Sequence, residues 1–274
     1  MTLLEKTKES ISFIEEKLGY RPTPKIALVL GSGLGVYADD LQDIKEIDFQ
    51  DIPHFSKASV EGHKGKLIFG KIHGKEVALL QGRYHFYEGK GIDVVTYPIR
   101  VLYKLGIEVL FTTNATGGLN PDFNAGDFMI ITDHINYMGV NPLIGANEDD
   151  FGPRFPDMTN IYTKELVDLA KSVAKEIDLD IKTGVLVGYS GPNYETPAEI
   201  KFFRMIGGDN VGMSTIPETI VASHCGLKVL SISSITNMAA GIHKSKLSHS
   251  EVMEISKEMI PTFKKLVDGI IAKL

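Results

Sequence analysis

The chain has 274 residues, 43% of them hydrophobic, with a net charge of −6. This length is enough for one large domain with a full hydrophobic core, or for two small domains. A mildly acidic chain with 23% charged residues argues against broad electrostatic binding to nucleic acid or anionic lipid, although a local site for a small anion remains compatible. The single cysteine, Cys225, excludes an intrachain disulfide and fits a reducing compartment, so we expect a cytoplasmic protein.

The first residues are charged and amphipathic, which is not the pattern of a signal peptide. No apolar run approaches the roughly 18 residues that a membrane helix needs. We therefore expect neither a membrane nor a nucleic acid as a partner.

In the first half of the chain, apolar residues at helical spacing predict a helix that ends at Gly19. Two apolar runs flank His73 and Gly74 and predict a β-hairpin. A helical pattern over residues 93–105 ends at Gly106. The other strands expected here cover residues 26–31, 107–113 and 127–132.

The second half continues the alternation of helices and strands. A Ser/Thr-x-x-Glu pattern, typical of a capping box at a helix start, begins at Thr196, Thr215 and Ser248. Strands are expected over residues 183–189 and 227–235. Alternating elements together with a hairpin predict one α/β domain spanning residues 1–274, with a mixed central sheet flanked by helices.

Residues 134–161 interrupt this pattern. The segment is rich in glycine, proline and asparagine and has no clear periodicity. Loops this long inside a compact domain are usually functional or disordered. Its aromatic and apolar residues argue against simple disorder.

Two small, glycine-rich segments follow predicted strands. GSGLG (residues 31–35) would expose backbone N–H groups and the Ser32 hydroxyl to an anion. Val36 stands where a dinucleotide fingerprint requires glycine or alanine, and no Walker lysine follows. TNATGGLNP (residues 113–121) is similar, and ligands of α/β proteins bind beyond strand ends. Either segment alone is equally compatible with a structural turn.

GRYHFYEG (residues 82–89) follows an apolar run. In an extended chain Arg83, His85 and Tyr87 would point the same way. The arginine fork and the imidazole suit an anion, and the phenol suits a sugar. The alternative is a solvated strand end.

Three further segments carry polar groups next to predicted elements. Tyr194 and Glu195 precede a capped helix and suit a flat heterocycle, although Glu195 could also serve only the helix N-terminus. Ser214 and Asn237 are polar groups at strand ends, and Met213 suits either a sugar contact or the core.

The sequence lacks the motifs that are typical of metal binding and of covalent catalysis. The eight histidines form no metal-binding spacing, so we expect no metal. No GxSxG elbow is present and Cys225 has no evident base, so we do not expect covalent catalysis.

The motifs GSGLG, GHKGKLIFG, QGRYHFYEG, TNATGGLNP, GPNYET, GMSTIPE and ITN occur together in this order. Over nearly the whole chain this order resembles the trimeric purine nucleoside phosphorylases. The resemblance implies the nucleoside phosphorylase fold and reversible cleavage of purine nucleosides by inorganic phosphate. It also implies no cofactor, since phosphate is a co-substrate.

The same resemblance assigns the site. The implied phosphate-binding residues are Ser32, His63, Arg83, His85, Ala115 through its backbone, and Ser214. The implied nucleoside-binding residues are Tyr87, Phe155, Tyr194, Glu195, Met213, Asn237 and His249. The implied catalytic residues are His85, Glu195 and Asn237.

Further expectations follow from the family. The protein would be a homotrimer in which Phe155 reaches a neighbouring active site. Glu195 with Asn237 favours 6-oxopurines such as inosine and guanosine, and the reaction fits purine salvage. Tyr194 stands where phenylalanine is frequent. His243 competes with His249 for the contact to the 5′-hydroxyl.

Three alternatives remain open from the sequence. A methylthioadenosine phosphorylase shares the fold and phosphate site but prefers aspartate at the position of Asn237. A nucleotide-dependent oxidoreductase is suggested only by GSGLG, whose fingerprint is broken. A purine-binding protein without catalysis would not need the full set of donors.

Overall fold

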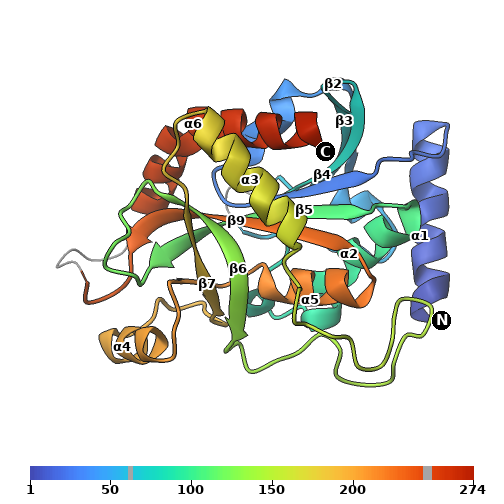
Figure 1. The fold of residues 1–274 in the computed structure, drawn as a ribbon. Coiled ribbons are helices and arrows are strands. Elements are labelled where there is room, and N and C mark those ends of the chain that lie inside the picture. Colours follow the sequence, from blue (N-terminus) through green and yellow to red (C-terminus); the bar gives the residue numbers. More distant parts are fainter. Residues whose placement is uncertain (61–63, 243–248) are drawn as a thin grey trace.

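The computed structural model describes residues 1–60, 64–242 and 249–274, without the side chains of residues 249–251. In this part of the chain one mixed sheet has the strand order β2-β3-β4-β1-β5-β8-β7-β6-β9, and β5 also pairs with β9 (Figure 1). The strands are β1 (Ile26–Leu30), β2 (Gln42–Asp48), β3 (Lys66–Ile72), β4 (Lys75–Gln81), β5 (Val109–Gly118), β6 (Phe128–Asn136), β7 (Lys182–Gly188), β8 (Asn210–Gly212) and β9 (Lys228–Met238).

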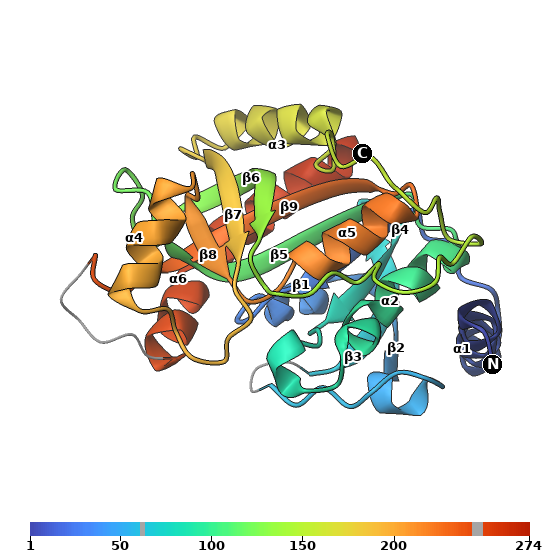
Figure 2. The ribbon, with the colours of Figure 1, turned by 90° about the horizontal axis from the view of Figure 1, so that it is seen from below.

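Helices cover both faces of this sheet, as expected. They are α1 (Leu3–Leu18), α2 (Ile92–Leu105), α3 (Lys164–Glu176), α4 (Pro197–Met205), α5 (Ile216–His224) and α6 (His249–Lys273). In Figure 1, α6 lies above the sheet, α3 crosses in front of it, and α2 and α5 lie below it; Figure 2 shows α2 and α5 side by side. The α/β class and the mixed sheet are therefore confirmed.

The central strands are parallel and buried. β1 pairs in parallel with β4 and β5, and β5 pairs in parallel with β9. All five residues of β1 are buried. Because parallel strands share a direction, the carboxyl ends of β1, β4, β5 and β9 meet at one edge, where ligands of α/β proteins bind.

The sequence patterns that predicted turns and helix ends agree with the observed backbone. Gly19 and Gly106 adopt left-handed conformations at the ends of α1 and α2. His73 and Gly74 turn β3 into the antiparallel β4. Thr196 caps α4, and its capping box is complete. These turns and caps are confirmed.

Three predictions at the local level are wrong. Residues 113–118 continue β5 instead of forming a loop, because they pair along their length with β9. Strand β2 was missed, whereas β8 ends two residues before Ser214, near the strand end expected there. Thr215 makes no side-chain cap at the start of α5. The third expected capping box, at Ser248, lies outside the described residues.

A close backbone contact joins β1 to β5 at the edge of the sheet. A Cβ on Gly31 would lie 2.8 Å from the Cα of Asn114 and 2.9 Å from the carbonyl oxygen of Thr113. The Thr113 hydroxyl accepts from the Gly31 backbone N–H at 3.0 Å and donates to the carbonyl of Val29 at 3.0 Å. Glycine at this position therefore lets GSGLG lie against β5.

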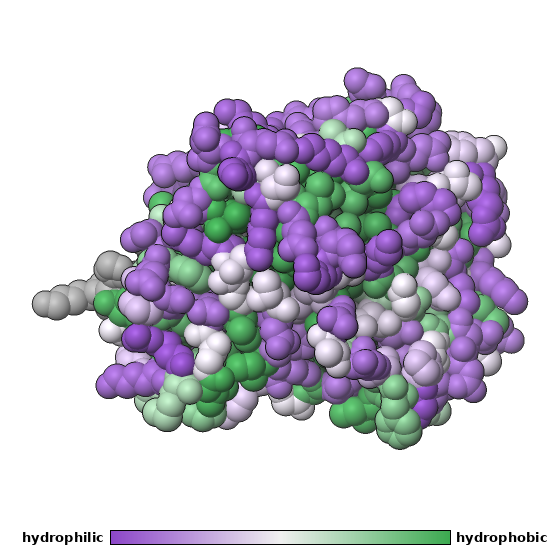
Figure 3. Space-filling model, in the orientation of Figure 1, coloured by the Kyte–Doolittle hydropathy of each residue, from purple (hydrophilic) through white to green (hydrophobic). Residues whose placement is uncertain are grey.

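The long segment over residues 134–161 begins as β6 and then runs as an irregular loop to α3. It presents apolar side chains at the surface: Phe155 is 87% exposed and Ile144 is 78% exposed. Figure 3 shows the molecule in the orientation of Figure 1. Apolar side chains lie along its lower edge, over α4 and over this loop. None of the described helices is both long and apolar enough to cross a membrane.

Candidate active site

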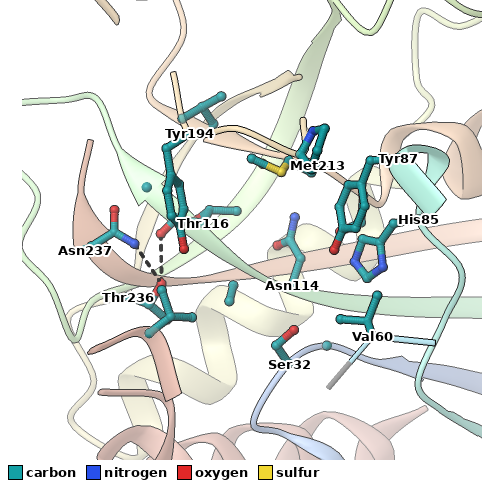
Figure 4. A pocket seen from close by; sticks show the side chains of 18 of the residues that line it. Ser32, Val60, His85, Tyr87, Asn114, Thr116, Tyr194, Met213, Thr236 and Asn237 are labelled. Atoms are coloured by element: carbon teal, nitrogen blue, oxygen red, sulfur yellow. Dashed lines mark hydrogen bonds between the residues drawn. The ribbon is translucent and has the colours of Figure 1, made fainter. Parts of the chain in front are cut away.

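A cavity of about 340 Å³ lies at the carboxyl edge of the central strands. Its walls include Arg83 and Ser214 as well as Glu195 and Asn237, so the expected anion-binding and base-binding groups share one space. In Figure 4, Ser32, His85 and Tyr87 lie at one end of the pocket and Tyr194 and Asn237 at the other. The cavity therefore carries polar side chains at both ends.

Arg83 follows β4 and is only 3% exposed. Its Nε donates to Glu218 Oε1 at 3.0 Å. One terminal nitrogen, Nη1, donates to the Thr113 carbonyl at 2.6 Å and to the Ser214 hydroxyl at 3.2 Å. A buried guanidinium held by three acceptors has a fixed orientation, as an anion-binding fork requires.

His85 and Tyr87 lie beside this arginine. Their rings stack with centroids 4.8 Å apart. Glu88 accepts the His85 backbone N–H at 2.6 Å, and its Oε1 lies 3.6 Å from His85 Nδ1. Although burial opposes ionisation, hydrogen bonds from His85, Ser59 and Lys90 hold the pKa of Glu88 well below its usual range. A permanent carboxylate therefore orients the imidazole.

Tyr87 does not lie in an extended chain, because residues 86–88 form a 3-10 helix. Its ring still lines the cavity. Burial raises the pKa of Tyr87 to about 12, so the phenol stays neutral and can donate a hydrogen bond.

The opposite end of the cavity carries Glu195 and Asn237. Glu195 is 6% exposed, and burial raises the pKa of its carboxyl group. Asn237 lies near the end of β9, and its Nδ2 donates to the Thr236 hydroxyl at 3.3 Å. A carboxyl and an amide that line the same cavity offer both acceptors and donors to a planar heterocycle.

Met213 forms one wall between the two ends. A Cβ on Gly191 would lie 2.4 Å from the Met213 sulfur and 3.2 Å from the Tyr87 ring. Gly191 has a φ of +65°, so the chain passes close over these side chains only because a glycine is present. The wall is therefore tightly packed.

The structure brings together most of the residues that the sequence singled out. The cavity is lined by Ser32, Arg83, His85, Tyr87, Ala115, Tyr194, Glu195, Met213, Ser214 and Asn237. Phe155 does not line it and lies on the exposed loop. His63 and His243 lie outside the described residues. His249 is the first residue of α6, and its side chain is also outside them.

Sequence reasoning missed two buried residues of the site. Asn114 lines the cavity with 1% exposure, and neither end of its amide has a hydrogen-bond partner within the described part of the chain. Glu218 pairs with Arg83 from α5. A polar amide inside the apolar pattern of β5 was a signal for Asn114, whereas Glu218 looked like a capping residue.

Neither metal chemistry nor a reactive thiol finds support. Within residues 1–60, 64–242 and 249–274, no group of three or more histidine, cysteine or acidic side chains is placed to hold a metal ion. Burial raises the pKa of the Cys225 thiol to about 11, which disfavours the nucleophilic thiolate.

Comparison with known proteins gives a consistent assignment. The family model described as "Phosphorylase superfamily" matches residues 25–272. The chain is 51% identical to purine nucleoside phosphorylase 1 of Bacillus subtilis, over 98% of each chain. It is 43% identical to the Bos taurus purine nucleoside phosphorylase, over 92% of this chain and 89% of the relative.

Solved structures agree with the sequence relatives. The crystal structure of Schistosoma mansoni purine nucleoside phosphorylase in complex with inosine superposes with a TM-score of 0.94 at 39% identity. The match covers 100% of this chain and 98% of the other. The protein of the same organism in complex with adenosine has the same TM-score and identity.

The matched fold and the polar cavity at its strand ends define a nucleoside phosphorylase-type enzyme of the phosphorylase superfamily. At this level of identity and coverage, the chain belongs to the purine nucleoside phosphorylases, which are pentosyltransferases. A nucleotide-dependent oxidoreductase is therefore excluded.

Glu195→Gln is expected to stabilise the ligand-free protein near pH 7.5. The folded-state pKa of Glu195 is raised by burial, so its stability contribution is fully present below the unfolded pKa of about 4.3 and is lost as pH rises through the folded pKa. Thermal unfolding should show a higher melting temperature than wild type at pH 7.5, with a difference that shrinks towards pH 4.

Glu199→Gln is the matched control, because hydrogen bonds from Thr196 lower the pKa of Glu199. It should give no gain at pH 7.5. An unchanged or lower melting temperature for Glu195→Gln at that pH would contradict the account.

Proposed function

We propose that the protein catalyses the reversible phosphorolysis of 6-oxopurine ribonucleosides and 2′-deoxyribonucleosides. The products are a free base and a pentose 1-phosphate. The observation that carries this proposal is the single cavity in which Arg83 and Ser214 face the same space as Glu195 and Asn237.

Phosphate binds at the Arg83 end of the cavity. The guanidinium, the hydroxyls of Ser32 and Ser214, the His85 ring and the backbone at Ala115 surround that end. Phosphate oxygens accept hydrogen bonds from all of these donor types. His63, whose position is not described, completes the set in the proposal.

The purine binds at the Glu195 end. Ionised Glu195 accepts a hydrogen bond from N1–H of a 6-oxopurine, and the Asn237 amide bonds N7 and the 6-oxygen. Tyr194 packs on the base, while Tyr87 and Met213 contact the pentose between the ends. A 6-aminopurine lacks the N1–H, so Glu195 in its ionised form would be left unpaired. Aspartate in place of Asn237, the pattern of methylthioadenosine phosphorylases, would suit that base better.

Cleavage proceeds through positioning and electrostatics. As the glycosidic bond lengthens, the sugar becomes oxocarbenium-like and the base gathers negative charge. Asn237 stabilises that charge at N7, and the bound phosphate pairs with the cationic sugar before attacking C1′. His85, oriented by Glu88, holds the phosphate in line. No covalent enzyme intermediate is required.

The protein works as a homotrimer in this proposal, with Phe155 completing the sugar site of a neighbouring subunit. The supporting observation is the exposure of Phe155 and Ile144 on one ordered loop. Large apolar groups gathered at a surface are typical of an interface. His249 supplies the contact to the 5′-hydroxyl, with His243 as its rival. The reaction suits purine salvage in the cytoplasm.

Base release from four nucleosides tests the activity directly. Inosine and guanosine should release base only when phosphate is present. Adenosine and methylthioadenosine should react with kcat/KM at least about 100-fold lower, because they leave Glu195 unpaired. Release without phosphate would identify a hydrolase, and equal rates on adenosine would contradict the assigned base contacts.

Asn237→Ala should lower kcat on inosine about 100-fold, because the amide acts on charge that develops in the transition state. The KM for phosphate should stay within about threefold, since the anion binds at the other end of the cavity. Asn193→Ala, which removes a neighbouring amide bonded to Tyr189 and Tyr194, is the control and should keep full turnover. Unchanged turnover for Asn237→Ala would refute its role.

Phe155→Ala should lower kcat/KM for inosine about tenfold, because the side chain is exposed within its own chain and contacts the neighbouring sugar site in this proposal. Met205→Ala, which removes another exposed apolar side chain, should retain activity. Sedimentation of the wild-type protein should give a trimer. A fully active monomer would overturn the shared-site proposal.

A further inference from the structure

Thr215 and Glu218 have the sequence spacing of a helix cap but do not form one. Thr215 has a φ of +73° and makes no side-chain cap to α5. A positive φ is unusual for a β-branched residue and marks a backbone held by its surroundings. Glu218 is buried, and its side chain turns to Arg83 instead. The pattern therefore serves another purpose here.

The contacts of Arg83 indicate that Glu218 helps to orient the guanidinium. Glu218 accepts from Nε, while the Thr113 carbonyl and the Ser214 hydroxyl accept from Nη1. Bonds from two different nitrogens fix both the position and the plane of the guanidinium. The Thr113 contact alone would still let that plane rotate.

Burial makes this pair costly to disrupt. The side chains of Arg83 and Glu218 are 2% and 3% exposed. Two buried charges gain little net stability from each other, but losing the geometry of one leaves the other poorly compensated. Such a pair is therefore better explained by the orientation that it imposes than by the stability that it adds.

The turn before α5 links this pair to the second anion donor. Ser214 precedes the strained Thr215, and Glu218 lies in the first turn of α5. One short segment thus carries both a hydroxyl of the anion site and the carboxylate that orients its arginine.

We propose that Glu218 is a positioning residue for phosphate: it sets the plane of the Arg83 guanidinium and does not itself touch substrate. Glu218 does not line the cavity, whereas Arg83 and Ser214 do. This inference rests on the proposed phosphate site and adds that the position of the Glu218 oxygen, more than its charge, determines phosphate binding.

Two substitutions separate position from charge. Glu218→Gln keeps an acceptor at the same distance and removes the charge; Glu218→Asp keeps the charge and withdraws the oxygens by one methylene. Steady-state kinetics with varied phosphate should show KM raised about tenfold for Glu218→Asp but within about threefold for Glu218→Gln. The KM for inosine at saturating phosphate should change less than about twofold in both.

Glu5→Gln is the control, because Glu5 belongs to a complete capping box on α1, away from the cavity. It should leave both KM values unchanged. A larger phosphate KM for Glu218→Gln than for Glu218→Asp, no change in either, or equal rises for inosine and phosphate would overturn the proposal. A wild-type protein without phosphate-dependent base release would instead overturn the proposed function.

Discussion

A buried positive charge is the constraint around which this molecule is organised. The Arg83 guanidinium is almost inaccessible to solvent, and it must find acceptors inside the protein. Those acceptors come from the middle of β5, from the turn after β8 and from α5, three segments that lie apart in the sequence. The site therefore depends on the long-range packing that brings these three segments together.

The cavity also contains a buried acidic group, the carboxyl of Glu195. This burial raises the pKa of the Glu195 carboxyl group. The protein accepts an unfavourable carboxylate here, as functional sites commonly do. A base that donates a hydrogen bond to this carboxylate would favour its ionised form.

Local sequence chemistry was enough to predict the α/β class, the hairpin at His73 and Gly74, and most residues of the cavity. Ordered motifs contributed what periodicity could not, because Ser32, Arg83 and Asn237 lie far apart in the chain. Long-range pairing explains the failures. Residues 113–118 became strand because β9 pairs with them, and Glu218 left its expected cap because a buried arginine competes for it. Neither partner is visible from the local sequence.

A crystal structure with inorganic phosphate and hypoxanthine bound tests the central claim most directly. The account predicts the anion within hydrogen-bond distance of Arg83, Ser32 and Ser214, and the base against Glu195 and Asn237 in the same cavity. An anion bound away from Arg83, or a base that contacts neither Glu195 nor Asn237, would contradict it.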